Sequence, residues 1–137
     1  MIITPADGWS QMSDTVTLTF AARTHNAALA RTVAAAMSAR ADLPLDQLED
    51  VRLAVDEAVS QSILDAPDSA DVTCRFTREG GELDITVSAP SQSGRLPGTN
   101  TFSWTVLSAL VDEVSASLAD GVVTIRMHVV RHVVVDA

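Results

Sequence analysis

The chain has 137 residues, 47% of them hydrophobic and 20% charged, with a formal net charge of −9 at pH 7. This length predicts one domain with a real core, which we expect over residues 15–137 after a flexible leader over residues 1–14. The acidic charge argues against direct nucleic-acid binding but suits a basic partner. No secretory signal and no apolar run of about 20 residues is present, so we expect a cytoplasmic protein without a membrane span.

The first two predicted elements are a strand and a helix. Residues 15–22 alternate apolar side chains with threonines, as a half-buried strand does. Thr24 is a candidate N-cap for a helix over residues 25–40. Its predicted buried stripe consists of Leu29, Val33 and Met37. Arg31 falls on another side of this helix, among small residues.

A second helix is predicted over residues 46–65, after the break at Pro44. Asp46 can cap it, with Glu49 three positions later as in a capping box. Its main buried stripe should contain Leu48, Val51, Val55, Ala58 and Ser62. A neighbouring stripe contains Leu53, Glu57, Gln61 and Leu64.

A hairpin and a loop follow. Residues 72–77 and 83–89 alternate with a period of two, and the sequence EGGE between them predicts the turn. Residues 90–100 are rich in Pro, Gly, Ser and Asn, which is typical of a loop.

The last predicted elements are a short helix and a second hairpin. Residues 102–110 carry Phe102, Val106 and Leu110 at helical spacing, so we expect Phe102 to fasten this helix to the core. Trp104 lies off that stripe and is either an exposed binding anchor or an ordinary helix residue. Two strands then meet around Asp120-Gly121.

This order of elements defines the expected fold class. Hairpin strands beside grouped helices predict an α+β protein, specifically a two-layer α/β sandwich whose mostly antiparallel sheet carries its helices on one face.

Few residues suggest catalysis or metal binding. Cys74 lies in a predicted strand, so it is expected to be a buried, inert thiol. His25, His128 and His132 are interpreted as surface or edge histidines, and no metal site is predicted. Glu57 is the one plausible general base if its helix faces a cleft, although a solvated carboxylate is the alternative. The sequence contains neither a nucleophile elbow nor a Walker loop.

Three segments resemble the RsbW family of anti-sigma factors and serine-protein kinases: LEDVRLAVDEAVSQSI, FSWTVLSALVDEV and DGVVTIRM. The similarity covers about residues 15–130 and is strongest to actinobacterial UsfX-like anti-sigma factors. It implies the GHKL, or histidine-kinase-like, ATPase fold. It also implies that the chain sequesters an alternative stress or developmental sigma factor, and that an antagonist with a STAS fold releases it. Family members often form homodimers, and the strand-and-first-helix surface is a candidate interface.

The nucleotide site that this resemblance implies is degenerate. The family's base corresponds to Glu57, and its magnesium-binding Asn corresponds to Gln61, whose longer side chain weakens an octahedral site. The carboxylate that reads adenine corresponds to Ala89. The glycine-containing lid is shortened, and we interpret Gly94 and Gly98 as turn residues. We therefore expect no cofactor.

Two residues are candidate partner contacts, and two alternative functions remain. Arg31 corresponds to a family arginine that touches both partners, and Trp104 is the second candidate. In one alternative, the protein is an active serine kinase that uses ATP, magnesium and Glu57 as catalytic base. In the other, it is a small-molecule sensor with an apolar cavity beneath Glu57.

Overall fold

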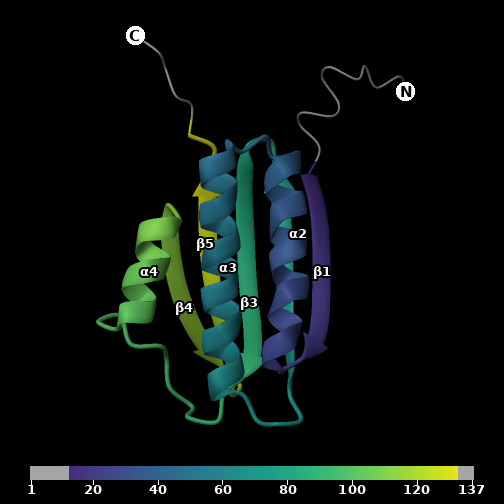
Figure 1. Cartoon of the computed structure of the whole chain (residues 1–137). Coiled ribbons are helices and arrows are strands. Elements are labelled where there is room, and N and C mark those ends of the chain that lie inside the picture. The colour runs from purple at the N-terminus through teal and green to yellow at the C-terminus, as the bar shows by residue number, and fades with distance from the viewer. Residues whose placement is uncertain (1–12, 133–137) are drawn as a thin grey trace.

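The computed structural model describes residues 13–132 as one α+β sandwich, so the predicted fold class is confirmed (Figure 1). The elements in chain order are β1 (Ser13–Ala21), the 3-10 helix η1 (Thr24–Asn26), α2 (Ala27–Arg40), α3 (Leu45–Asp65), β2 (Asp71–Glu79), β3 (Glu82–Pro90), α4 (Phe102–Leu110), β4 (Glu113–Ala119) and β5 (Val122–Val130). Strand β1 begins two positions before its predicted start. The rest of the predicted leader, residues 1–12, lies outside the described residues.

The sheet has five strands in the order β1-β2-β3-β5-β4, and every neighbouring pair is antiparallel. Both predicted hairpins are confirmed. Residues Asp120 and Gly121 close the second one with φ values of 52° and 76°, the left-handed conformation that a tight two-residue hairpin turn requires. Helices α2, α3 and α4 lie on one face of this sheet (Figure 1).

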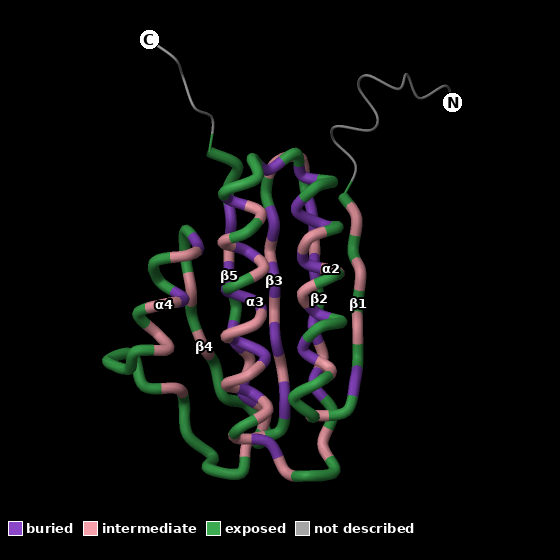
Figure 2. Tube along the Cα trace, viewed as in Figure 1, coloured by how far each residue is buried: buried purple, intermediate pink, exposed green. Residues whose placement is uncertain are grey.

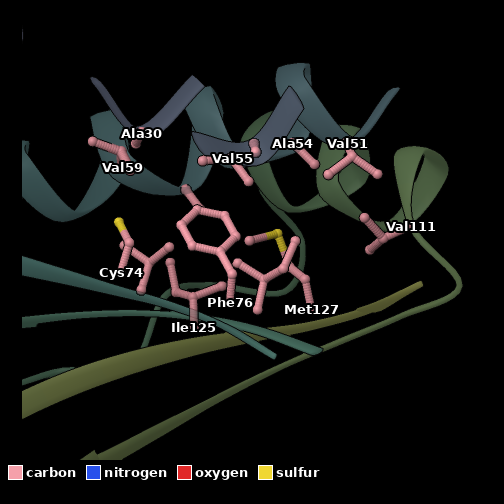
Figure 3. Packing of buried hydrophobic residues seen from close by; sticks show 14 of the residues in the cluster. Ala30, Val51, Ala54, Val55, Val59, Cys74, Phe76, Val111, Ile125 and Met127 are labelled. Atoms are coloured by element: carbon pink, nitrogen blue, oxygen red, sulfur yellow. The ribbon is translucent and has the colours of Figure 1, made fainter. Parts of the chain in front are cut away.

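The core lies between the sheet and the helices. Buried positions alternate with half-buried or exposed ones along β2 and β3, because successive strand side chains point to opposite faces (Figure 2). Phe76 of β2 is fully buried and points toward Val55 of α3, with Ile125 and Met127 beside it (Figure 3). Cys74 is also fully buried, as predicted, and burial raises the pKa of its thiol to about 12.

The predicted buried stripe of α2 is wrong for two of its three residues. Met37 is buried, but Val33 is only half-buried and Leu29 is 50% exposed. The buried side chains are Ala27, Ala30, Ala34, Met37 and Ser38. The predicted stripe repeated every four residues, whereas the spacing of the buried residues is closer to the helical period of 3.6 residues. Because most of the buried side chains are small alanines, α2 can lie close to its neighbours.

The stripe predicted for α3 is largely confirmed. Its buried residues include Val51, Val55, Ala58 and Ser62, whereas Leu48 is half-buried. In the neighbouring stripe, Leu53 and Leu64 are 56% and 86% exposed, whereas Glu57 and Gln61 are half-buried.

Both predicted helix caps are wrong. Thr24 lies within η1, and the α2 N-cap is Asn26, whose side chain donates to the Ala21 carbonyl and makes no capping bond. Helix α3 begins at Leu45 after an N-cap at Pro44, so Asp46 already lies in its first turn. In this position the negative charge of Asp46 still stabilises the helix, because it lies near the positive end of the helix dipole.

Candidate functional site

A cavity of about 140 Å³ lies between the C-terminal half of α3, strands β3 and β5, and the loop after β3. Gln61 and Ser62 line it from the helix, and Ala89 lines it from the end of β3. Gln61 and Ala89, separated by 28 positions in the sequence, are therefore brought to one site as predicted.

The predicted pocket residue Glu57 is not part of the cavity lining. It is half-buried on α3, one turn before Gln61, and its carboxylate makes no hydrogen bond or ion pair with another residue of the described range 13–132. The apolar cavity therefore lies farther along α3 than the sequence predicted, because the helix continues for two turns past Glu57 and the loop packs against its end.

The side chain of Gln61 is held by helix α4. Its Oε1 accepts a hydrogen bond of 3.1 Å from the Ser103 hydroxyl. Helix α4 is in turn capped by Thr101, whose hydroxyl oxygen accepts from the Trp104 amide at 3.2 Å. The oxygen that would approach a metal ion is thus already used in a contact between two helices.

The loop after β3 is fastened to the end of α3 by Asp65, a residue that the sequence analysis missed. The Asp65 carboxylate accepts from the Ser91 hydroxyl and, at 3.1 Å each, from the amide and hydroxyl of Ser93. Its backbone carbonyl accepts from the Gln92 amide at 2.7 Å. These donors, the Ser91 hydroxyl first, hold the pKa of Asp65 below its usual value.

Two glycines of the predicted site lie in this loop but do not line the cavity. Gly94 has φ +64°, and its amide donates to the Ser91 hydroxyl at 3.0 Å. The Gly98 carbonyl accepts from the Thr101 hydroxyl at 2.9 Å. Their positions fit the interpretation as turn residues.

Arg31 lies on a different surface, formed by α2 and α3. Its guanidinium donates a hydrogen bond of 2.6 Å to the Asp56 carboxylate, and the two side chains are 38% and 37% exposed. The candidate partner contact therefore already has an acidic partner within the chain. Asp56 had not been singled out, because nothing in the sequence places it beside Arg31, 25 positions earlier.

The predicted placement of Phe102 is wrong, and Trp104, for which two alternatives were open, is an ordinary helix residue that packs against the core. Phe102 is 84% exposed, whereas Trp104 is half-buried and packs against the core. Leu107 is the buried residue of this helix, and Trp104, three positions earlier, shares its face. Phe102 lies five positions before Leu107, which places it about 140° around the helix, so its side chain faces away from the core.

No group of three His, Cys, Asp or Glu side chains that could hold a metal ion occurs in residues 13–132. Of the three histidines, His128 lies 3.4 Å from Glu82 and His132 lies 2.7 Å from Asp112. Of the helices in the same range, none is long and apolar enough to cross a membrane.

This layered arrangement, with the cavity beside Gln61 and Ala89, is that of a histidine kinase-like ATPase domain. Residues 20–129 match the family of that description, so the chain belongs to the histidine kinase-like ATPase domain family. The predicted RsbW-type relationship is confirmed by the relatives described next.

The chain is 34% identical over 110 residues to the anti-sigma-F factor RsbW of Mycobacterium tuberculosis, with the same figures for the proteins of two strains. The match covers 80% of this chain and 66% of those relatives, so the chain spans just under two thirds of their length. A crystal structure of the RsbU and RsbW domains of a Mycobacterium tuberculosis protein has the same fold, with a TM-score of 0.69 and 18% identity. That likeness covers 88% of this chain and 35% of the other.

Proposed function

We propose that this protein is a cytoplasmic anti-sigma factor that sequesters an alternative sigma factor stoichiometrically and is released by an antagonist with a STAS fold. The name of its relatives, anti-sigma-F factor, supports the first part of this proposal. In the proposed mechanism, capture of the sigma factor requires neither ATP nor magnesium.

The observation that carries the proposal is the size and lining of the cavity beside Gln61. At about 140 Å³ it is well below the roughly 300 Å³ at which pockets for drug-sized ligands begin. Ala89 offers no acceptor for an adenine amino group, and Arg95 and Leu96 of the loop also line the cavity. These features support a degenerate nucleotide site.

The surface formed by α2 and α3 supports binding of another protein. The side chains of Arg31 and Asp56 are each more than a third exposed, and the carboxylate of Glu57, the next residue of α3, has no partner in residues 13–132. Leu53, which is 56% exposed and lies three positions before Asp56 on the same side of α3, adds apolar area. Charged groups beside apolar side chains give an interface both orientation and stability.

We also propose a homodimer that uses β1 and α2. Strand β1 lies at one edge of the sheet, where one row of backbone groups has no partner strand in the described residues. Light scattering on the purified chain would measure its mass, and a monomer at all concentrations would contradict a dimer.

The experiment that tests the main proposal is co-purification of the tagged chain with a sigma factor, identified by mass spectrometry, with and without added magnesium and ATP. We expect equal recovery of the sigma factor under both conditions. Failure to recover any sigma factor, or recovery that requires ATP, would contradict nucleotide-independent capture.

A further inference from the structure

We propose that the cavity beside Gln61 is a binding site for a small apolar monocarboxylate of about the size of benzoate. This inference goes beyond the capture of a sigma factor and does not depend on it.

The size of the cavity selects the body of such a ligand. Its volume of about 140 Å³ is close to the roughly 150 Å³ of an engineered cavity that binds benzene. A single ring therefore fits, whereas a complete nucleotide does not.

The walls of the cavity are suited to an apolar body. Ala89, Val123 and Ile125 form its floor, and all three are buried in the sheet. Leu96 and Pro97 line it from the loop. Leu96 is 53% exposed, so a ligand that covers it would remove apolar surface from water, which favours binding.

The polar groups of the cavity provide donors for a carboxylate. Arg95 lines the cavity, and its guanidinium makes no hydrogen bond or ion pair with another residue between 13 and 132, although its backbone amide donates to the Ser93 hydroxyl at 3.3 Å. A guanidinium binds carboxylates through two parallel hydrogen bonds. The Gln61 amide uses its oxygen to accept from Ser103, which leaves its Nε2 group as a second donor.

Asp65 also lines the cavity, and it determines which charge the ligand can carry. Both of its carboxylate oxygens accept hydrogen bonds from the loop, one from the Ser93 amide and the other from the Ser91 and Ser93 hydroxyls. Three of its roughly four acceptor sites are therefore used within the loop, which leaves little capacity to bind an ammonium group directly. Its negative charge opposes a bound anion, which makes the contribution of Arg95 necessary.

The first test is a titration of the full chain with sodium benzoate, followed by amide NMR shifts of the residues that line the cavity. Benzyl alcohol and benzylamine are the matched probes, because they carry a similar ring with a neutral or a positive group. We expect saturable binding of benzoate and at least tenfold weaker binding of both other probes. No saturable shift with benzoate, or tighter binding of benzylamine, would overturn the proposal.

The second test compares Arg95→Gln with Arg75→Gln. Arg75 is an exposed arginine of β2 on the sheet face without helices, so its variant has the same change in net charge. Arg95→Gln should weaken benzoate binding at least tenfold, because it removes the charge and both hydrogen bonds that the guanidinium gives to the carboxylate. Equal binding by both variants would overturn the assigned role of Arg95.

The third test fills or blocks the cavity. Ala89→Leu adds volume to the floor and should abolish benzoate binding, with the melting temperature as a check on folding. Leu96→Glu is the companion variant, because this exposed position tolerates a polar residue and the new carboxylate repels the ligand. If either folded variant binds benzoate like the unchanged chain, the ligand lies elsewhere and the proposal fails.

Discussion

Arg31 of α2 donates a hydrogen bond of 2.6 Å to Asp56 of α3, and more than a third of each side chain remains exposed. An exposed ion pair of this kind contributes about 0–1 kcal/mol to folding, because water screens both charges. A partner protein can therefore replace this contact at little cost. The Arg31 side chain therefore contributes both to the folded chain, through Asp56, and to the proposed binding of a partner.

We expect Arg31→Glu to abolish binding of the sigma factor, because it reverses the charge of the proposed anchor and places a second carboxylate beside Asp56. The free energy of unfolding should fall by only about 1 kcal/mol. Co-purification and thermal unfolding would measure the two effects. Arg75→Glu, on the opposite face of the sheet, is the control, and unchanged capture by Arg31→Glu would place the partner surface elsewhere.

Asp56→Asn is expected to act in the opposite direction. It removes the charge that holds Arg31 in the free protein, so an acidic group of the partner no longer has to displace it. We predict tighter binding of the sigma factor, by about twofold to fivefold on the scale of an exposed ion pair. Surface plasmon resonance would measure it. Weaker binding would show that Asp56 contacts the partner directly.

The hydrogen bonds of Asp65 predict an acid-sensitive loop. The folded-state pKa of this carboxyl lies below its ordinary value of 3.8, so its contribution to stability is fully present above that value and is lost as the pH falls through the folded pKa. Asp65→Asn should therefore unfold with a weaker dependence on pH below 4, and should be less stable at neutral pH by about 1 kcal/mol, since solvent screens these partly exposed hydrogen bonds.

Hydrogen exchange would locate this effect. In Asp65→Asn, faster exchange of the Gln92 and Ser93 amides relative to those of β2 would show that the carboxylate holds the loop. Unchanged exchange at both positions would show that the loop is held by other contacts.

Cys74 is expected to resist modification in the folded protein. Its thiol is fully buried and its pKa is raised to about 12, so almost no thiolate is present at neutral pH. A thiol reagent should react quickly in denaturant and only at the rate of unfolding in buffer. Rapid reaction of the folded chain would contradict the burial of this side chain.

The strands and both hairpins could be predicted from the sequence because their signals are local. The period of two in residues 83–89 and the turn at Asp120-Gly121 depend on near neighbours alone. The helix caps and the α2 stripe depend on tertiary contacts instead. Pro44 starts α3 without a capping side chain, and alanines rather than Leu29 face the core.

The residues of the candidate site could be predicted where they occupy the positions of recognisable family residues. Gln61 and Ala89 were found because they replace recognisable residues of the RsbW family, and both line the cavity. Asp65 and Arg95 were missed, since a carboxylate at the end of a helix and an arginine in a loop are ordinary. Their importance follows only from the folded position of the loop.

The proposed function requires that this chain binds a protein partner and does not bind a nucleotide. Isothermal titration of the purified chain with magnesium and ATP tests it most directly. We predict no saturable heat at millimolar ATP. Saturable, magnesium-dependent binding that is lost in an Ala89→Leu variant would contradict the claim, because it would place a nucleotide in the cavity beside Gln61.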